Sequence, residues 1–227
     1  MRLRHYDVIL GAFAVCLILS NVASTKIVRV GGSVFDGGTL LFPMTYIFGD
    51  VLTEVYGYAR ARRAIWFGLG ANILGAATLG FVAKLPSDAS SPTIGAFDAV
   101  GGFVWRIVLA SAIAFFVGEF LNSFVLARLK VATSGRFLWM RTIGSTIVGE
   151  GADTVIFTTI AFAGAVPRSV LLSIMLFNYV YKVGLEVVLT PVTYRVVGFL
   201  KRSEGIDVYD RKTSFSPFRR STSARVG

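Results

Sequence analysis

The chain has 227 residues, of which 54% are hydrophobic and only 16% charged, and its mean hydropathy is +0.68. A soluble domain of this length cannot bury that much apolar surface, so the composition predicts an integral membrane protein. The net charge of +10 does not indicate a nucleic-acid-binding module, because the basic residues lie in short gaps between apolar runs. A single cysteine, Cys16, and a single histidine, His5, argue against an intrachain disulfide, a metal site or a histidine-dependent hydrolase.

Six segments are apolar and long enough to cross about 30 Å of hydrocarbon as α-helices. They cover residues 6–25, 40–58, 64–83, 107–126, 143–166 and 170–200. The first resembles a signal peptide, but the later spans favour an uncleaved helix. The last exceeds one straight span, so we expect it to tilt and to bend near Pro191. The predicted fold is all-α, with one six-helix membrane domain over residues 1–200 and a basic, disordered cytoplasmic tail over residues 201–227.

The distribution of Lys and Arg orients these spans, because short cytoplasmic loops carry the positive excess. With six spans, every basic cluster falls on one side of the membrane. These clusters are Arg2 and Arg4; Arg60, Arg62 and Arg63; Arg128, Lys130, Arg136 and Arg141; and Arg195, Lys201 and Arg202. The other side carries only Lys26, Arg29, Lys84, Arg106 and Arg168. Both termini are therefore predicted to be cytoplasmic.

Polar side chains recur along most of the spans at helical spacing. An ionisable group near the bilayer centre costs about 2.5–3.5 kcal/mol, so each one needs a partner, water or a function. Residues three or four apart share one face of a helix. The polar stripes are Ser20, Asn21, Ser24, Thr25 and Lys26; Tyr46, Asp50 and Glu54; Glu119, Asn122 and Ser123; Glu150, Asp153 and Thr154; and Asn178, Lys182, Glu186 and Thr190. In three places, at Gly49, Gly118 and Gly149, the acid directly follows a glycine.

Helices satisfy such stripes by turning them towards one another, so the pattern predicts a polar central cavity. A site of this kind near the membrane midplane is typical of a transporter. The alternative is structural, since hydrogen bonds between membrane helices contribute about 0.6 kcal/mol each. For Lys182 and Glu186 alone both readings stay open, because a pair one turn apart can simply neutralise itself.

Five of the six spans carry longer motifs. These are SN at Ser20, FPMTYIFGDVLTEVYG from Phe42, GEFLNSFVLARLK from Gly118, STIVGEGADTVIFTTIAFAG from Ser145, and NYVYK from Asn178 with a later Pro191 and Tyr194. Together they resemble the queuosine precursor transporters, an inner-membrane family of about this length. The resemblance implies import of 7-cyano-7-deazaguanine, 7-aminomethyl-7-deazaguanine or both, the bases that salvage pathways build into queuosine of transfer RNA.

A guanine-like edge offers two hydrogen-bond donors that one carboxylate accepts together. Asp153 is the first candidate for this role, with Glu150 and Glu119 as alternates. The other candidate substrate-binding residues are the amides Asn21, Asn122 and Asn178, the rings of Phe42, Tyr46 and Tyr179, and the ammonium group of Lys182. Asp50, Glu54 and Glu186 are candidates for proton coupling, while facilitated transport stays open.

Two other functions stay open. A substrate-binding subunit of an energy-coupling vitamin importer would need a separate ATPase, because no GxxxxGK loop occurs in the chain. An intramembrane enzyme would use paired acids, but the familiar histidine, cysteine and zinc motifs are absent from the sequence. We therefore predict a multi-pass transporter of the bacterial inner membrane and no enzyme. Its predicted partners are a purine-like small molecule and the lipid bilayer but no nucleic acid, and a homo-oligomer stays open.

Overall fold

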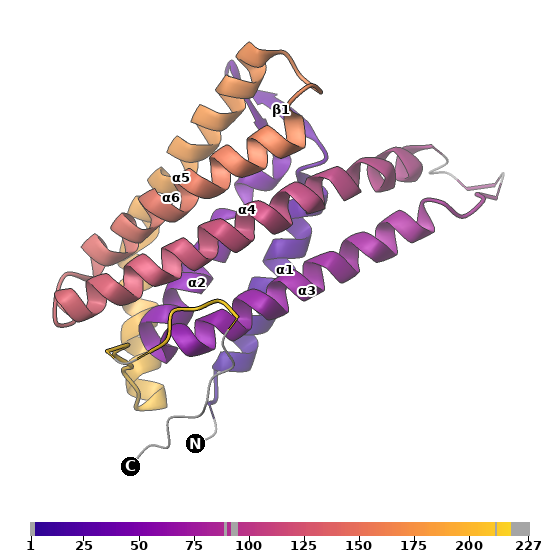
Figure 1. The fold of residues 1–227 in the computed structure, drawn as a ribbon. Coiled ribbons are helices and arrows are strands. Elements are labelled where there is room, and N and C mark those ends of the chain that lie inside the picture. Colours follow the sequence, from indigo (N-terminus) through magenta and orange to yellow (C-terminus); the bar gives the residue numbers. More distant parts are fainter. Residues whose placement is uncertain (1–2, 89, 92–94, 212, 219–227) are drawn as a thin grey trace.

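The computed structural model describes residues 3–88, 90–91, 95–211 and 213–218, and most of them are α-helical (Figure 1). Helices follow one another along the chain, and a short hairpin lies between the first two. The elements are α1 (Tyr6–Ala23), β1 (Ile27–Val30), β2 (Ser33–Asp36), the 3-10 helix η1 (Gly37–Leu40), α2 (Pro43–Tyr56), α3 (Tyr58–Val82), α4 (Ala96–Ala132), α5 (Leu138–Phe162) and α6 (Arg168–Glu204). Each of the six predicted segments overlaps one α-helix.

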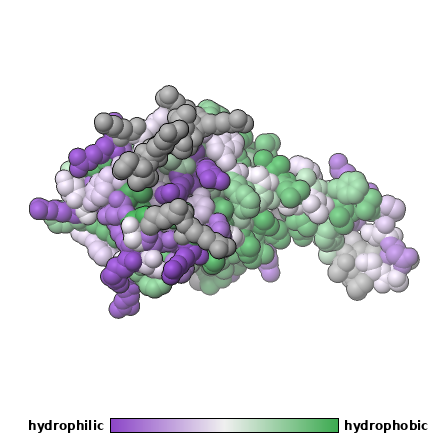
Figure 2. Space-filling view, turned by 90° about the horizontal axis from the view of Figure 1, so that it is seen from below, coloured by the Kyte–Doolittle hydropathy of each residue, from purple (hydrophilic) through white to green (hydrophobic). Residues whose placement is uncertain are grey.

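Four of the helices, α1, α3, α4 and α6, are long and apolar enough to cross a membrane. Helix α2 has 14 residues, about 21 Å at a rise of 1.5 Å per residue. Helix α5 is long but carries Glu150 and Asp153 near its middle. Figure 2 views the molecule from the end where the tail lies, and it shows hydrophilic residues gathered there and apolar surface along the flank. These features confirm a mainly α-helical protein with helices suited to a membrane.

The hairpin of β1 and β2 is not among the predicted elements. Its strands pair antiparallel from Ile27 opposite Asp36 to Val30 opposite Ser33. Gly31 and Gly32 form the turn with φ of +55° and +84°, a combination that two-residue hairpin turns require and that glycine adopts without strain. The pairing places Asp36 at the base of the hairpin, next to the end of α1.

Helices α4 and α5 approach each other closely where Gly118 faces Gly149. A methyl group on Gly149 would lie 2.8 Å from the Gly118 carbonyl oxygen, and one on Gly118 would lie 2.9 Å from the Gly149 carbonyl oxygen. The two backbones therefore touch, as small residues allow in membrane helix pairs. A methyl group on Gly49 of α2 would overlap the carboxylate of Glu119. All three glycine–acid motifs thus lie in tightly packed contacts.

An ion cluster around the buried carboxylate of Glu54 joins four helices at the end of the bundle where the tail lies. One carboxylate oxygen of Glu54 lies 2.9 Å from Arg141, 2.7 Å from Lys201 and 3.4 Å from Lys130. Both lysines also contact Asp207, at 2.6 and 2.9 Å. Burial raises the pKa of Asp207, but the hydrogen bonds from the two lysines outweigh it and lower that pKa below its usual range. We call these five residues the Glu54 cluster.

Much of the tail lies against the bundle (Figure 1). Asp210 accepts a hydrogen bond of 2.9 Å from the backbone N–H of Tyr58 at the start of α3, where a carboxylate is favourable. Arg62 donates to two backbone carbonyls of the tail, and the Phe215 ring contacts Tyr58 and Phe124. Residues 205–211 and 213–218 thus make contacts that a disordered tail would lack, while residues 219–227 lie outside the described part.

We predict that Gly149→Ala lowers the thermal stability of the purified protein. The added methyl group meets backbone that cannot rotate away, and overpacking of this kind costs about 1–3 kcal/mol. Gly184→Ala in α6 is the matched control, because nothing lies within 4 Å of the methyl group there and alanine favours helix. Thermal unfolding in detergent, followed by size-exclusion chromatography, measures both. A Gly149→Ala variant as stable as the control would contradict the backbone contact.

Candidate functional site

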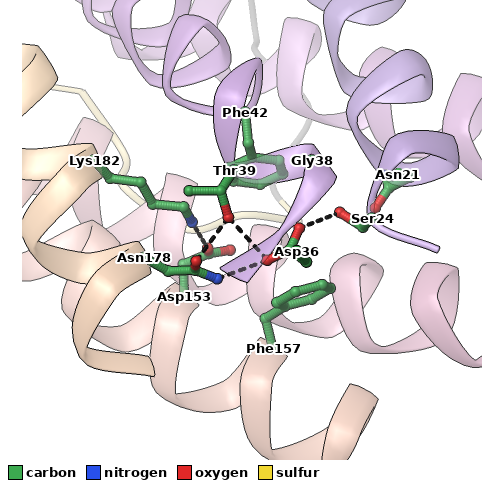
Figure 3. Close-up of a pocket in the computed structure, with 10 residues that line it drawn as sticks. All are labelled: Asn21, Ser24, Asp36, Gly38, Thr39, Phe42, Asp153, Phe157, Asn178 and Lys182. Atoms are coloured by element: carbon green, nitrogen blue, oxygen red, sulfur yellow. Dashed lines mark hydrogen bonds and ion pairs between the residues drawn. The ribbon is translucent and has the colours of Figure 1, made fainter. Parts of the chain in front are cut away.

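A pocket lies where the end of α1, the base of the hairpin, η1, the start of α2, α5 and α6 meet (Figure 3). Its volume is about 250 Å³, including the part open to solvent. Only about 10 Å³ of it is free space for a water-sized molecule, room for about one water, so in this conformation the side chains fill most of the pocket. The lining residues are Asn21, Ser24, Asp36, Gly38, Thr39, Phe42, Asp153, Phe157, Asn178 and Lys182.

Two pairs of lining residues come from helical spacing. Asp153 and Phe157 are four residues apart on α5, and Asn178 and Lys182 are four apart on α6, so each pair shares one face. The spacing of Asn178 and Lys182 in the sequence predicted a polar face on α6, whereas the polar face of α5 was predicted from Glu150 and Asp153. The close approach of η1 and α1 depends on Gly38, because a methyl group there would overlap the Ser24 hydroxyl.

Lys182 is the only basic residue of the lining, and it contacts two acids. Its ammonium nitrogen lies 2.8 Å from one Asp153 oxygen and 2.9 Å from one Glu150 oxygen. The same nitrogen lies 4.3 Å from the centre of the Phe42 ring, a cation–π contact. All three charged side chains are at most 4% exposed. The second oxygen of Asp153, Oδ1, is buried with no hydrogen-bond partner among the residues that the structure describes.

Asp36 is held by neutral donors. Ser24 donates to its Oδ1 at 2.6 Å, and Thr39 and Asn178 donate to its Oδ2 at 2.9 and 2.7 Å. The Thr39 hydroxyl also lies 2.7 Å from the Asn178 side-chain oxygen. Because a hydroxyl carries one hydrogen, Thr39 can donate to only one of these two acceptors at a time. Figure 3 shows this group of side chains between the rings of Phe42 and Phe157.

The structure brings half of the ten predicted substrate-binding residues into the pocket. These are Asn21, Phe42, Asp153, Asn178 and Lys182. Glu150 adjoins them through its ion pair with Lys182. Glu119, Asn122 and Tyr46 are buried outside the lining, and neither oxygen of Glu119 has a hydrogen-bond partner within the described part of the chain. Tyr179 points elsewhere, with its hydroxyl 3.4 Å from the carbonyl of Ile147.

The three residues predicted for proton coupling lie outside the pocket lining and in different surroundings. Asp50 accepts a hydrogen bond of 2.7 Å from Asn122, and its other oxygen has no partner in the described residues. Glu54 belongs to the ion cluster at the tail end. Glu186 is buried, with one oxygen that lacks a described partner. Their role in coupling stays a prediction.

Several pocket residues were missed by the sequence analysis. Asp36, Thr39 and Phe157 are not among the predicted site residues, yet all three line the pocket. Asp36 and Thr39 belong to the hairpin and η1, where no helical repeat marks a buried face. The sequence Asp36-Gly37-Gly38 was the available signal, since an acid followed by two glycines fits a tight backbone approach. Among the described residues no group of three or more His, Cys, Asp or Glu side chains is placed to hold a metal ion.

Comparisons with known proteins agree with these features. Residues 36–196 match the family described as "Putative vitamin uptake transporter". The chain is 32% identical over 200 residues to the "Probable queuosine precursor transporter" of Bacillus subtilis, which covers 86% of this chain and 84% of the relative. It is 29% identical over 164 residues to the "Queuosine precursor transporter" of Escherichia coli, which covers 70% of this chain and 71% of the relative. No solved structure matches.

The family match covers α2 to α5, most of α6 and the last residue of the hairpin, so it includes eight of the ten pocket residues. It begins at Asp36, the acid at the base of the hairpin. The family is one of transporters, in agreement with the prediction that the chain is not an enzyme. The chain therefore belongs to the vitamin uptake transporter family, together with the queuosine precursor transporters that its motifs resemble.

Proposed function

We propose that this protein imports queuosine precursors, 7-cyano-7-deazaguanine, 7-aminomethyl-7-deazaguanine or both, across the bacterial inner membrane. The names of the relatives from Bacillus subtilis and Escherichia coli support the substrate class. One observation links the proposed substrate to this pocket. Asp153 presents a buried carboxylate oxygen without a described partner in a pocket between two aromatic rings.

The chemistry of a deazaguanine base suits this arrangement. Its guanine-like edge has a ring N–H beside an exocyclic amine, and the two oxygens of Asp153 accept such a pair of donors. The ion pair with Lys182, which lies 2.8 Å from Oδ2, favours the ionised form of Asp153. The rings of Phe42 and Phe157 offer faces for a flat base. The ligand enters by replacing contacts that the side chains now make with one another.

We further propose six membrane spans with both termini in the cytoplasm. Helix α2 crosses with the help of η1 and the chain around it, and its acids are covered by α4, α5 and α6. The basic residues of the Glu54 cluster then lie at the cytoplasmic end, as the positive-inside rule requires. The pocket, near the end of α1 and in the first half of α6, lies towards the outer face.

We predict that Asp153→Asn reduces uptake of deazaguanine base at nanomolar concentration to background. The substitution puts an amide donor where the base also donates, and a lost charged hydrogen bond costs about 1.5–3 kcal/mol, roughly 10- to 100-fold in affinity. Glu150 still pairs with Lys182, so the protein inserts and folds. Uptake of labelled base into proteoliposomes that contain this protein alone measures the effect and shows whether a partner ATPase is needed.

Asp88→Asn is the control for this experiment, because Asp88 is exposed in the loop between α3 and α4 and lies outside the pocket lining. It should import like the wild type. Normal uptake by Asp153→Asn would remove Asp153 from the site. No uptake by a correctly inserted wild-type protein would reject the proposed substrate or the assumption that the protein works alone, and addition of an energy-coupling ATPase complex separates the two.

The topology predicts which introduced cysteines react from outside the cell. In a Cys16→Ser background, Ser87→Cys lies in the loop after α3 and Ser134→Cys in the loop after α4, and both positions are exposed. We expect a membrane-impermeant maleimide to label Ser87→Cys in intact cells and Ser134→Cys only after permeabilisation. Labelling in the opposite order would invert the orientation, and labelling of both in intact cells would contradict the single span, α4, between the two positions.

A further inference from the structure

The charges around the pocket are not balanced. Three carboxyl groups, Asp36, Glu150 and Asp153, adjoin a single cation, Lys182, which is shared between Glu150 and Asp153. No described basic side chain lies within 4.0 Å of the Asp36 carboxylate. A buried charge without a counter-ion is unfavourable, so this carboxylate favours a cation that arrives with the ligand.

Asp36 also has room for one more hydrogen bond. An ionised carboxylate has about four acceptor positions, and Ser24, Thr39 and Asn178 occupy at most three of them. The neutral donors fix the orientation of the carboxylate without cancelling its charge. Since Asp36 is 2% exposed and lines the pocket, the remaining position is available to a bound ligand rather than to bulk water.

We infer that Asp36 determines which deazaguanine base is preferred, and that it selects the aminomethyl form over the cyano form. This inference rests on the proposed function, because it takes both bases as ligands of this pocket. The aliphatic amine of the aminomethyl base is protonated at neutral pH, as the lysine side chain is, so it is cationic and donates hydrogen bonds. A nitrile nitrogen is an acceptor only, so a carboxylate opposite it provides no donor and adds repulsion.

Different acids recognise the guanine-like edge and the substituent at position 7 of the base. Asp153 on α5 has an unpartnered oxygen for the guanine-like edge that both bases share. Asp36 on the hairpin reaches the same pocket from another element, and it is held by Asn178 of α6. Substitution of Asp153 therefore affects both bases, whereas substitution of Asp36 changes their ratio. This difference separates the present inference from the proposed function.

Binding of both bases to the purified protein tests the inference. We expect the wild type to bind the aminomethyl base at least about tenfold more tightly than the cyano base, as a charged hydrogen bond implies. Asp36→Asn should weaken binding of the aminomethyl base and strengthen binding of the cyano base, because the amide supplies a hydrogen-bond donor for the nitrile. Ser24→Ala, which removes one neutral donor and keeps the charge, should retain the wild-type order of preference.

The outcomes are distinct. The role of Asp36 would be overturned if the wild type preferred the cyano base, or if Asp36→Asn weakened the binding of both bases equally. Either result would leave the proposed function standing. Failure of the wild type to bind either base would overturn both. If Asp36→Asn does not fold, the affinity of the wild type for the aminomethyl base is compared with its affinity for a 7-hydroxymethyl analogue. This analogue has nearly the shape of the aminomethyl base without its charge. Equal affinity for these two ligands would equally overturn the inference.

Discussion

The shortage of cations among the buried acids is the constraint on which the structure depends. A buried charge inside an apolar bundle is costly without a partner, and Lys182 pairs with two acids at the pocket while Glu54 pairs with three cations at the other end. These two residues fix how α2, α4, α5 and α6 face one another. Lys182 and Lys201 lie on one helix, about 28 Å apart at 1.5 Å per residue, so α6 contributes a cation both to the pocket and to the Glu54 cluster.

Close packing of small residues makes these ion pairs attainable. The backbone contact between Gly118 and Gly149 brings α4 and α5 together beside the acids that follow each glycine, Glu119 and Glu150. Larger residues would separate the helices and admit either lipid or water. The helices therefore meet through glycine, and the acids beside them turn inward. The same contact leaves Glu119 buried without a described hydrogen-bond partner, which is costly for a charged carboxylate and acceptable for a protonated one.

Helical spacing explains what the sequence could predict about the site. Asp153, Asn178 and Lys182 stand on polar faces that repeat every three or four residues, and such a repeat predicts a buried face from the sequence alone. The same geometry places Tyr179 outside the pocket lining, since a residue adjacent to Asn178 is turned by about 100° around the helix. Asp36 has no such repeat. Its position depends on the register of the hairpin and on partners 12 and 142 residues away, which local patterns do not encode.

The charge asymmetry between the two ends bears on how a substrate passes. In the Glu54 cluster three cations meet two acids, whereas at the pocket three acids meet one cation. In the proposed orientation a cationic ligand is therefore attracted at the outer end and repelled by the cluster at the cytoplasmic end.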